Sequence, residues 1–82
     1  MLKLFRKTLP LDNYWKEYWR MPSQDEALKA AEEYAEDNHM SIKVLSSRFI
    51  ILDEKYYEVI PSVFFRGTYG VYIRRCRKED AL

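Results

Sequence analysis

The side chains that catalysis most often uses are scarce in this chain. Its 82 residues include one histidine, His39, and one cysteine, Cys76. Cys76 lies between Arg74-Arg75 and Arg77-Lys78, and cationic neighbours can activate an exposed thiol. However, the sequence supplies no second cysteine and no partner base. We therefore expect His39 to end a helix, Cys76 to be a small residue at a strand end, and the protein not to be an enzyme.

Metal and cofactor sites are equally unsupported by the residue types. One histidine and one cysteine cannot provide the four ligands of a structural zinc site. Gly67 and Gly70, the only glycines, lack the Lys-Ser/Thr that follows a phosphate-binding loop. The acidic residues of 25–37 recur on the outer side of a predicted helix, which is typical of a solvated face. We expect no catalytic residue, no metal, no cofactor and no small-molecule substrate.

A basic and aromatic C-terminal segment raises the question of nucleic-acid binding. Arg66–Ile73 reads RGTYGVYI, which partly matches the RNP1 signature of RNA-recognition motifs. Thr68 is an extra residue, Val71 replaces a stacking aromatic, and the βαββαβ order is missing, so that family is excluded. A looser strip of Tyr and Arg could still stack on bases. A small nucleic-acid-binding protein that uses its basic ends with Tyr69 and Tyr72 is therefore our alternative, although a net charge of +1 disfavours it.

The aromatic content favours a protein partner. Seven Tyr, four Phe and two Trp are difficult to bury completely in so short a chain. Tyr, Trp and Arg are also the residue types enriched at interface hot spots. We expect a non-catalytic binding module that acts through protein–protein interaction, as an adaptor, inhibitor or oligomerising subunit, with a protein partner or by self-association. The candidate interface residues are Tyr14, Trp19, Arg66, Tyr69, Tyr72, Arg74 and Arg75.

The densest aromatic stretch is NYWKEYWRMP, residues 13–22. Asp12 or Asn13 could cap a short helix over about residues 13–20, and Pro22 would end it. At about 100° per residue, its four aromatic side chains span an arc of about 160°, wider than the ~100° stripe of a one-sided helix. We expect mostly core residues here, with Tyr14 and Trp19 at the edges of the arc available to a partner.

The element with the clearest pattern is a long amphipathic helix over about residues 23–38. Ser23 and Glu26 form an S-x-x-E capping box. An alanine-rich stripe then recurs at helical spacing, and Asn38 could end the helix in a left-handed conformation.

The pattern changes to a period of two after the helix. Segments rich in β-branched and aromatic residues predict an antiparallel sheet of about four strands over residues 41–75, interrupted at Pro61-Ser62 and containing a hairpin loop at Arg66–Gly70. Leu2–Thr8 could be an edge strand or an ordered tail. The predicted fold is α+β, a single small domain over residues 1–82 whose tail, 77–82, frays.

Charge and composition complete the expectations. Residues 1–22 and 61–82 each carry five basic and two acidic side chains, whereas residues 23–60 carry four basic and nine acidic ones. If the ends meet, they form a modest basic patch. A single cysteine fits a reducing compartment, and no stretch approaches the ~20 apolar residues of a membrane span. We expect a cytoplasmic protein without a membrane segment.

Overall fold

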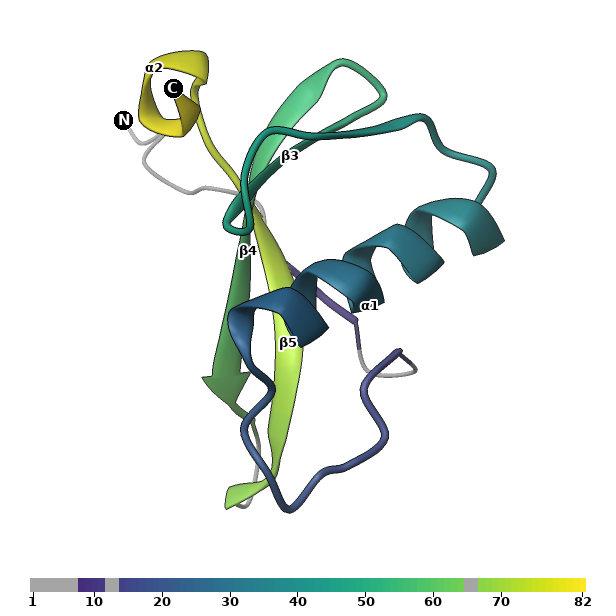
Figure 1. Ribbon diagram of the computed structural model, residues 1–82, viewed down its shortest axis with the longest axis vertical. Helices are drawn as coiled ribbons and strands as arrows, with labels where there is room; N and C mark the ends of the chain where they lie inside the picture. The colour runs from purple at the N-terminus through teal and green to yellow at the C-terminus, as the bar shows by residue number, and fades with distance from the viewer. Residues whose placement is uncertain (1–7, 12–13, 65–66) are drawn as a thin grey trace.

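A computed structural model describes residues 8–11, 14–64 and 67–82, and these residues form an α+β fold (Figure 1). Within the described residues, five strands form one antiparallel sheet in the order β1-β5-β4-β3-β2, and α1 crosses one face of it. A single helical turn, α2, follows the last strand. The elements are β1 Thr8–Pro10, α1 Gln24–Asp37, β2 Ile42–Val44, β3 Phe49–Leu52, β4 Lys55–Val63, β5 Tyr69–Arg75 and α2 Lys78–Ala81.

Helix α1 begins as the sequence predicts. The Glu26 backbone N–H donates to Ser23 Oγ at 3.1 Å, and the Ser23 N–H donates to Glu26 Oε1 at 2.9 Å, so the capping box is confirmed. The predicted end is wrong by one residue. Asn38 has φ −103°, whereas His39 has φ +56° and takes the left-handed conformation.

Small side chains let α1 lie close to the sheet. The most deeply buried side chains of α1, none more than 2% exposed, are Ala27, Ala30, Ala31 and Ala35. They pack in one cluster with Ile50 and Leu52 of β3, Val59 of β4, and Val71 and Ile73 of β5. Alanine supplies little apolar area, so the large aliphatic residues of the sheet and the side chains of Leu11 and Trp15 fill the remaining core.

The sheet differs from the predicted one in two places. First, β4 continues through Pro61 instead of stopping there. The Cys76 N–H donates to Tyr56 O, and the Phe64 N–H donates to Thr68 O. Hydrogen-bonded pairs alternate along an antiparallel ladder, so the backbone of Pro61 points away from β5 and its missing N–H removes no bond to that strand.

Second, a fifth strand comes from the N-terminal segment. β1 pairs with β5 in the register Thr8↔Arg74, Leu9↔Ile73 and Pro10↔Tyr72. A strand that pairs with the opposite end of the chain leaves no signal in its own sequence. The N-terminal sequence therefore could not distinguish an edge strand from an ordered tail. The alternation at Leu2 and Leu4 lies outside the described residues.

The predicted helix over residues 13–20 is also wrong, because the described residues 14–22 contain no α-helix. A helix of about eight residues is shorter than those that are stable in water. In a helix, the Tyr18 carbonyl would accept a hydrogen bond from the backbone N–H four residues later, but that residue is Pro22, which has no N–H. Instead it accepts the Tyr69 N–H of β5 at 2.9 Å. The expected capping residues Asp12 and Asn13 lie outside the described residues.

The C-terminal tail contains the single turn α2, and its fraying in solution remains a prediction. Within the residues that the structure describes, no helix is both long and apolar enough to cross a membrane.

Candidate interaction site

The segment that joins β1 to α1 holds its two tryptophans in opposite environments. We call residues 14–23 the Trp loop. Trp15 is 8% exposed and belongs to the core cluster, whereas Trp19 is 75% exposed. The same residue type, four positions apart, therefore stabilises the fold at one position and faces solvent at the other.

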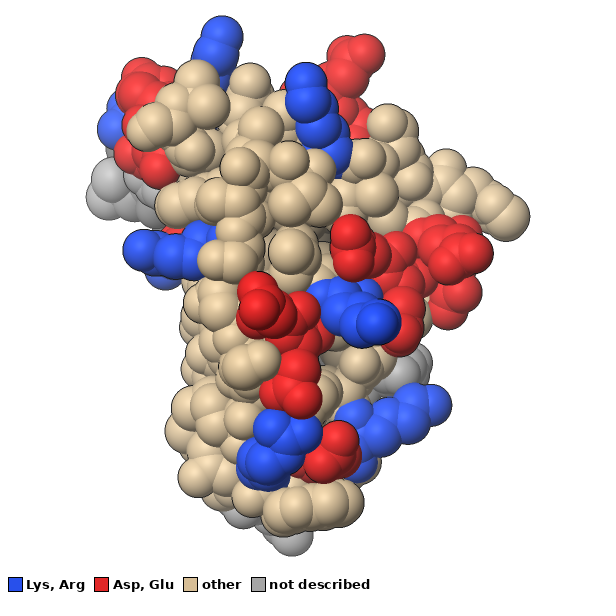
Figure 2. Space-filling model, viewed as in Figure 1, with Lys and Arg blue, Asp and Glu red and all other residues tan. Residues whose placement is uncertain are grey.

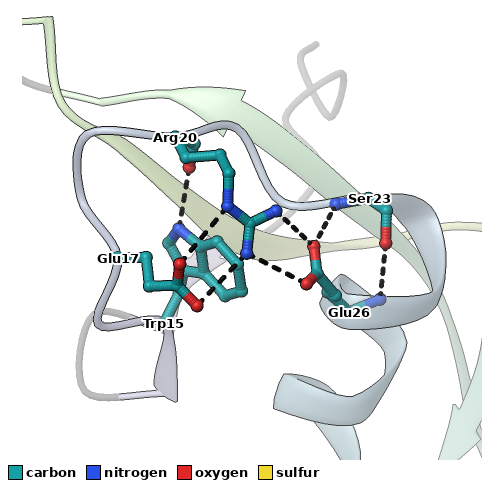
Figure 3. A network of polar contacts seen from close by, with 5 residues as sticks. All are labelled: Trp15, Glu17, Arg20, Ser23 and Glu26. Carbon is teal, nitrogen blue, oxygen red and sulfur yellow. Dashed lines mark hydrogen bonds and ion pairs between the residues drawn. The ribbon is translucent and has the colours of Figure 1, made fainter.

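Arg20 fixes the conformation of the Trp loop (Figure 3). Its guanidinium donates to both carboxylate oxygens of Glu26 at 3.0 Å and lies 3.1 Å from a Glu17 oxygen. The guanidinium carbon sits 4.9 Å from the centre of the Trp15 ring. The Arg20 carbonyl in turn accepts the Trp15 indole N–H at 3.0 Å. Trp19 directly precedes Arg20 in the chain, so the contacts of Arg20 fix the position of the Trp19 backbone.

The electrostatics of this network follow from its geometry. The Arg20 guanidinium and the Ser23 backbone N–H lower the pKa of Glu26 to about 2. The two carboxylates, Glu26 first and then Glu17, raise the pKa of Arg20. The ionised Glu26 carboxylate therefore completes the capping box of α1 and also holds the Trp loop in place.

Four exposed apolar side chains belong to the Trp loop and to the end of β4, and we call them together the tip patch. Its members are Tyr18 (48% exposed), Trp19, Met21 (42%) and Val63 (56%). A backbone hydrogen bond connects the Trp loop to the β4–β5 hairpin: the Tyr69 N–H donates to the Tyr18 carbonyl. Within the hairpin, Tyr69 pairs with Val63 across the strands. The patch thus combines segments from both halves of the chain.

A hollow of about 200 Å³ lies between the Trp loop and α1. It is lined by Tyr14, Trp15, Glu26, Lys29, Ala30 and Glu33. Pockets for small-molecule ligands usually measure about 300–1,000 Å³, so this hollow has the size for a single side chain. Figure 2 shows acidic side chains gathered over the side of the molecule where α1 lies.

Tyr14, one of the predicted interface residues, is tied to α1. Its hydroxyl donates to Asp37 Oδ2 at 2.9 Å, and this bond is the main reason that the pKa of Tyr14 is raised. Its ring meets the Tyr34 ring edge-on, with centroids 5.8 Å apart. These contacts hold the half-buried Tyr14 side chain in place, and it lines the hollow.

The predicted basic strip does not lie on one surface. Tyr72 and Arg74 alternate with the buried Val71 and Ile73, so they point to the sheet face opposite α1, and Arg75 points to the α1 side. Arg74 pairs with Glu58 at 2.8 Å. Arg66 lies outside the described residues. Of the predicted residues, Trp19 belongs to the tip patch, Tyr69 is hydrogen-bonded to the neighbouring Tyr18, and Tyr72 and Arg74 share the other face of the sheet.

Glu58 is a residue that sequence reasoning missed. Its side chain, 15% exposed, accepts hydrogen bonds from Arg48 at 2.6 Å and Arg74 at 2.8 Å. Desolvation alone would raise the pKa of Glu58, but the two arginines together outweigh it and lower the pKa. A single Glu in a predicted strand between apolar residues was the only available signal.

Among the residues that the structure describes, no three His, Cys, Asp or Glu side chains are grouped so that they could hold a metal ion. The chain matches no protein-family model, no curated protein and no solved structure.

Proposed function

We propose that this protein is a non-catalytic binding module that attaches to a protein partner through the tip patch, with Trp19 as the anchor. The observation that carries the proposal is the 75% exposure of Trp19 on a loop held in place by side-chain contacts. Tryptophan is among the residues most enriched at interface hot spots. A partner that covers Trp19 would explain why so large an apolar side chain is exposed to water.

The rigidity of the Trp loop supports the same proposal. Binding is weakened by the entropy lost when interface side chains and loops become ordered. The Trp loop is already joined to α1 through Arg20 and Glu26 and to β5 through Tyr18 and Tyr69. A partner would therefore meet a preorganised surface, and less of its interaction energy would be spent on ordering the loop.

Side chains are a better basis for this docking than addition of a strand. β4 extends beyond the residues that pair with β3, and this free part of its edge is poorly suited to pairing with another strand. Gln24 already donates to the Val59 carbonyl at 2.8 Å, and Pro61 has no N–H to donate. β2, at one of the two edges of the sheet, is three residues long and exposes Lys43. Short, charged or proline-containing edges disfavour pairing with another chain.

The nucleic-acid alternative has less support. Arg74 is already paired with Glu58, and its neighbour Arg75 faces the other side of the sheet. The proposal predicts no binding of single- or double-stranded DNA or RNA even at low salt. Binding that weakens steeply as salt increases would instead favour the alternative.

Site-specific photo-cross-linking tests the proposal directly. A photoreactive amino acid replaces Trp19 in one variant and Leu82, which is 76% exposed, in the control. We expect position 19, and not position 82, to cross-link in cells to a discrete protein product, which includes another copy of the chain. Equal labelling from the two positions would refute the proposal, because the two sites differ in location and not in exposure.

A further inference from the structure

We propose that the sheet face opposite α1, which we call the open face, is a second docking surface for an acidic segment of a different protein. The segment would present carboxylates and apolar side chains together. This inference goes beyond the proposed function and does not depend on it, because the open face and the tip patch share no residue. α1 packs against the other face of the sheet, and α2 is a single turn (Figure 1).

The composition of the open face is unusual for a sheet surface in water. Side chains alternate between the two faces of a strand, so the neighbours of the buried Ile50, Val59 and Ile73 point away from α1. An antiparallel sheet with one solvated face usually carries polar residues there. Here the outward side chains are mostly large, apolar and half-buried, namely Phe49 and Ile51 of β3, Tyr56 and Ile60 of β4, and Tyr72 of β5.

The charges of the open face are not balanced. The Glu58 carboxylate lies between two guanidinium groups, 2.6 Å from Arg48 and 2.8 Å from Arg74. One carboxylate compensates only one of these two positive charges. The Arg48 and Arg74 side chains remain 60% and 43% exposed, and a guanidinium has more N–H donors than one carboxylate uses. Lys43 adds a third positive charge, since its neighbour Ile42 packs against the core and Lys43 points to the open face.

A partner that combines acidic and apolar groups complements this face better than the other candidates do. Residues 1–7 of the same chain carry three basic side chains and no acidic one, so their charge opposes the face. The outer side of α1 in a second copy is acidic, but its apolar stripe is buried in its own core. The phosphates of a nucleic acid would meet Glu58, and the aliphatic Ile51 and Ile60 give bases no ring on which to stack.

Peptide selection tests the inference. A random peptide library displayed on phage is selected at low salt on the full chain. We expect the selected sequences to be enriched in Asp and Glu beside aromatic or aliphatic residues. A fluorescently labelled copy of the strongest peptide should bind more weakly as salt is raised, because salt screens the attraction between charges. No enrichment over the starting library, or enrichment of basic or uncharged sequences, would overturn the inference.

Matched variants locate this peptide on the sheet. Lys43→Glu should weaken its binding about three- to tenfold. Lys55→Glu makes the same change at an exposed residue that pairs with the buried Leu52 and so points to the α1 side, and it should not weaken binding. Tyr72→Ala should weaken binding at least about tenfold, as the loss of an aromatic contact residue does. Trp19→Ala should leave binding unchanged.

The outcomes separate this inference from the proposed function. Equal weakening by Lys43→Glu and Lys55→Glu overturns the open face as the site. Loss of binding in Trp19→Ala shows that the peptide uses the tip patch, which supports the proposed function and overturns this inference. Far-UV circular dichroism checks that each variant is folded, and if Tyr72→Ala unfolds, the exposed Lys43 decides the test.

Two controls address the other occupants of the open face. A single-stranded RNA oligonucleotide that binds the natural chain and is lost in Lys43→Glu would make the face a nucleic-acid surface. Growth of the natural chain into open-ended polymers with concentration, seen by sedimentation velocity and lost in Lys43→Glu, would identify a second copy whose α1 lies on the face. Either result overturns the inference, whereas cross-linking from position 19 still decides the proposed function.

Discussion

The two tryptophans of the Trp loop give the sharpest test of the structure. Replacing buried Trp15 with alanine should lower the free energy of unfolding by about 3–5 kcal/mol, because a large core side chain and its cavity are involved. Replacing Trp19, which is 75% exposed, should change it by no more than about 0.5 kcal/mol. A domain of this size has a total stability of only about 4–12 kcal/mol, so the first variant should be close to unfolding while the second is unaffected.

Urea denaturation followed by far-UV circular dichroism measures both values. Low protein concentration keeps any self-association from contributing to the result. Trp15→Phe is a graded control, because it keeps an aromatic ring in the core but loses the indole N–H that donates to the Arg20 carbonyl at 3.0 Å, a bond worth about 1 kcal/mol. Similar losses for Trp15→Ala and Trp19→Ala would refute the division of the loop into a core residue and a surface residue.

Three further predictions concern the supports of the site. Ser23→Ala should lower the free energy of unfolding by about 1 kcal/mol and Ser23→Gly by only a few tenths, as measured by urea denaturation. The pKa of Glu26 is lowered from 4.5 to about 2, so its stabilising effect is complete above about pH 4.5 and is lost as the pH falls toward about 2. Glu26→Gln should therefore flatten the pH dependence of stability in this range, and an unchanged profile would contradict the Arg20–Glu26 contact. Gly70→Ala would place a methyl group 3.0 Å from the Phe64 ring, and we expect thermal denaturation to show a cost of about 1–3 kcal/mol, whereas an unchanged melting temperature would show that the ring moves freely.

Glu26 couples the stability of α1 to the presentation of Trp19. Its carboxylate accepts from the Ser23 N–H, which starts the helix, and from Arg20, which holds the Trp loop. Loss of this carboxylate would therefore loosen the proposed binding surface and the helix start together. Ser23→Ala removes the Ser23 side-chain half of the cap and leaves the Arg20–Glu26 contact in place, so it serves as the control that separates the two effects.

Features set by neighbouring residues could be predicted from the sequence. The start of α1 depends on Ser23 and Glu26, three positions apart, and its buried stripe follows from the helical spacing of alanines. The β-branched and aromatic residues of β3 and β5 likewise predict strands. In each case the residues that decide the structure lie close together in the sequence, so the local sequence is enough to predict it.

Features that depend on distant partners were decided only by the tertiary structure. The Tyr18 carbonyl finds its donor on Tyr69 and not on Pro22, and this long-range bond replaces the predicted aromatic helix with a loop. The same change moves Trp15 into the core and leaves Trp19 in solvent, a difference that helical periodicity could not assign. β1 exists because β5 offers a free edge. Glu58 is stabilised because Arg48, which directly precedes β3, and Arg74 of β5 both reach it. Local pattern thus determined which segments form the helix and most of the sheet, whereas contacts across the chain determined which aromatic residue is exposed to solvent.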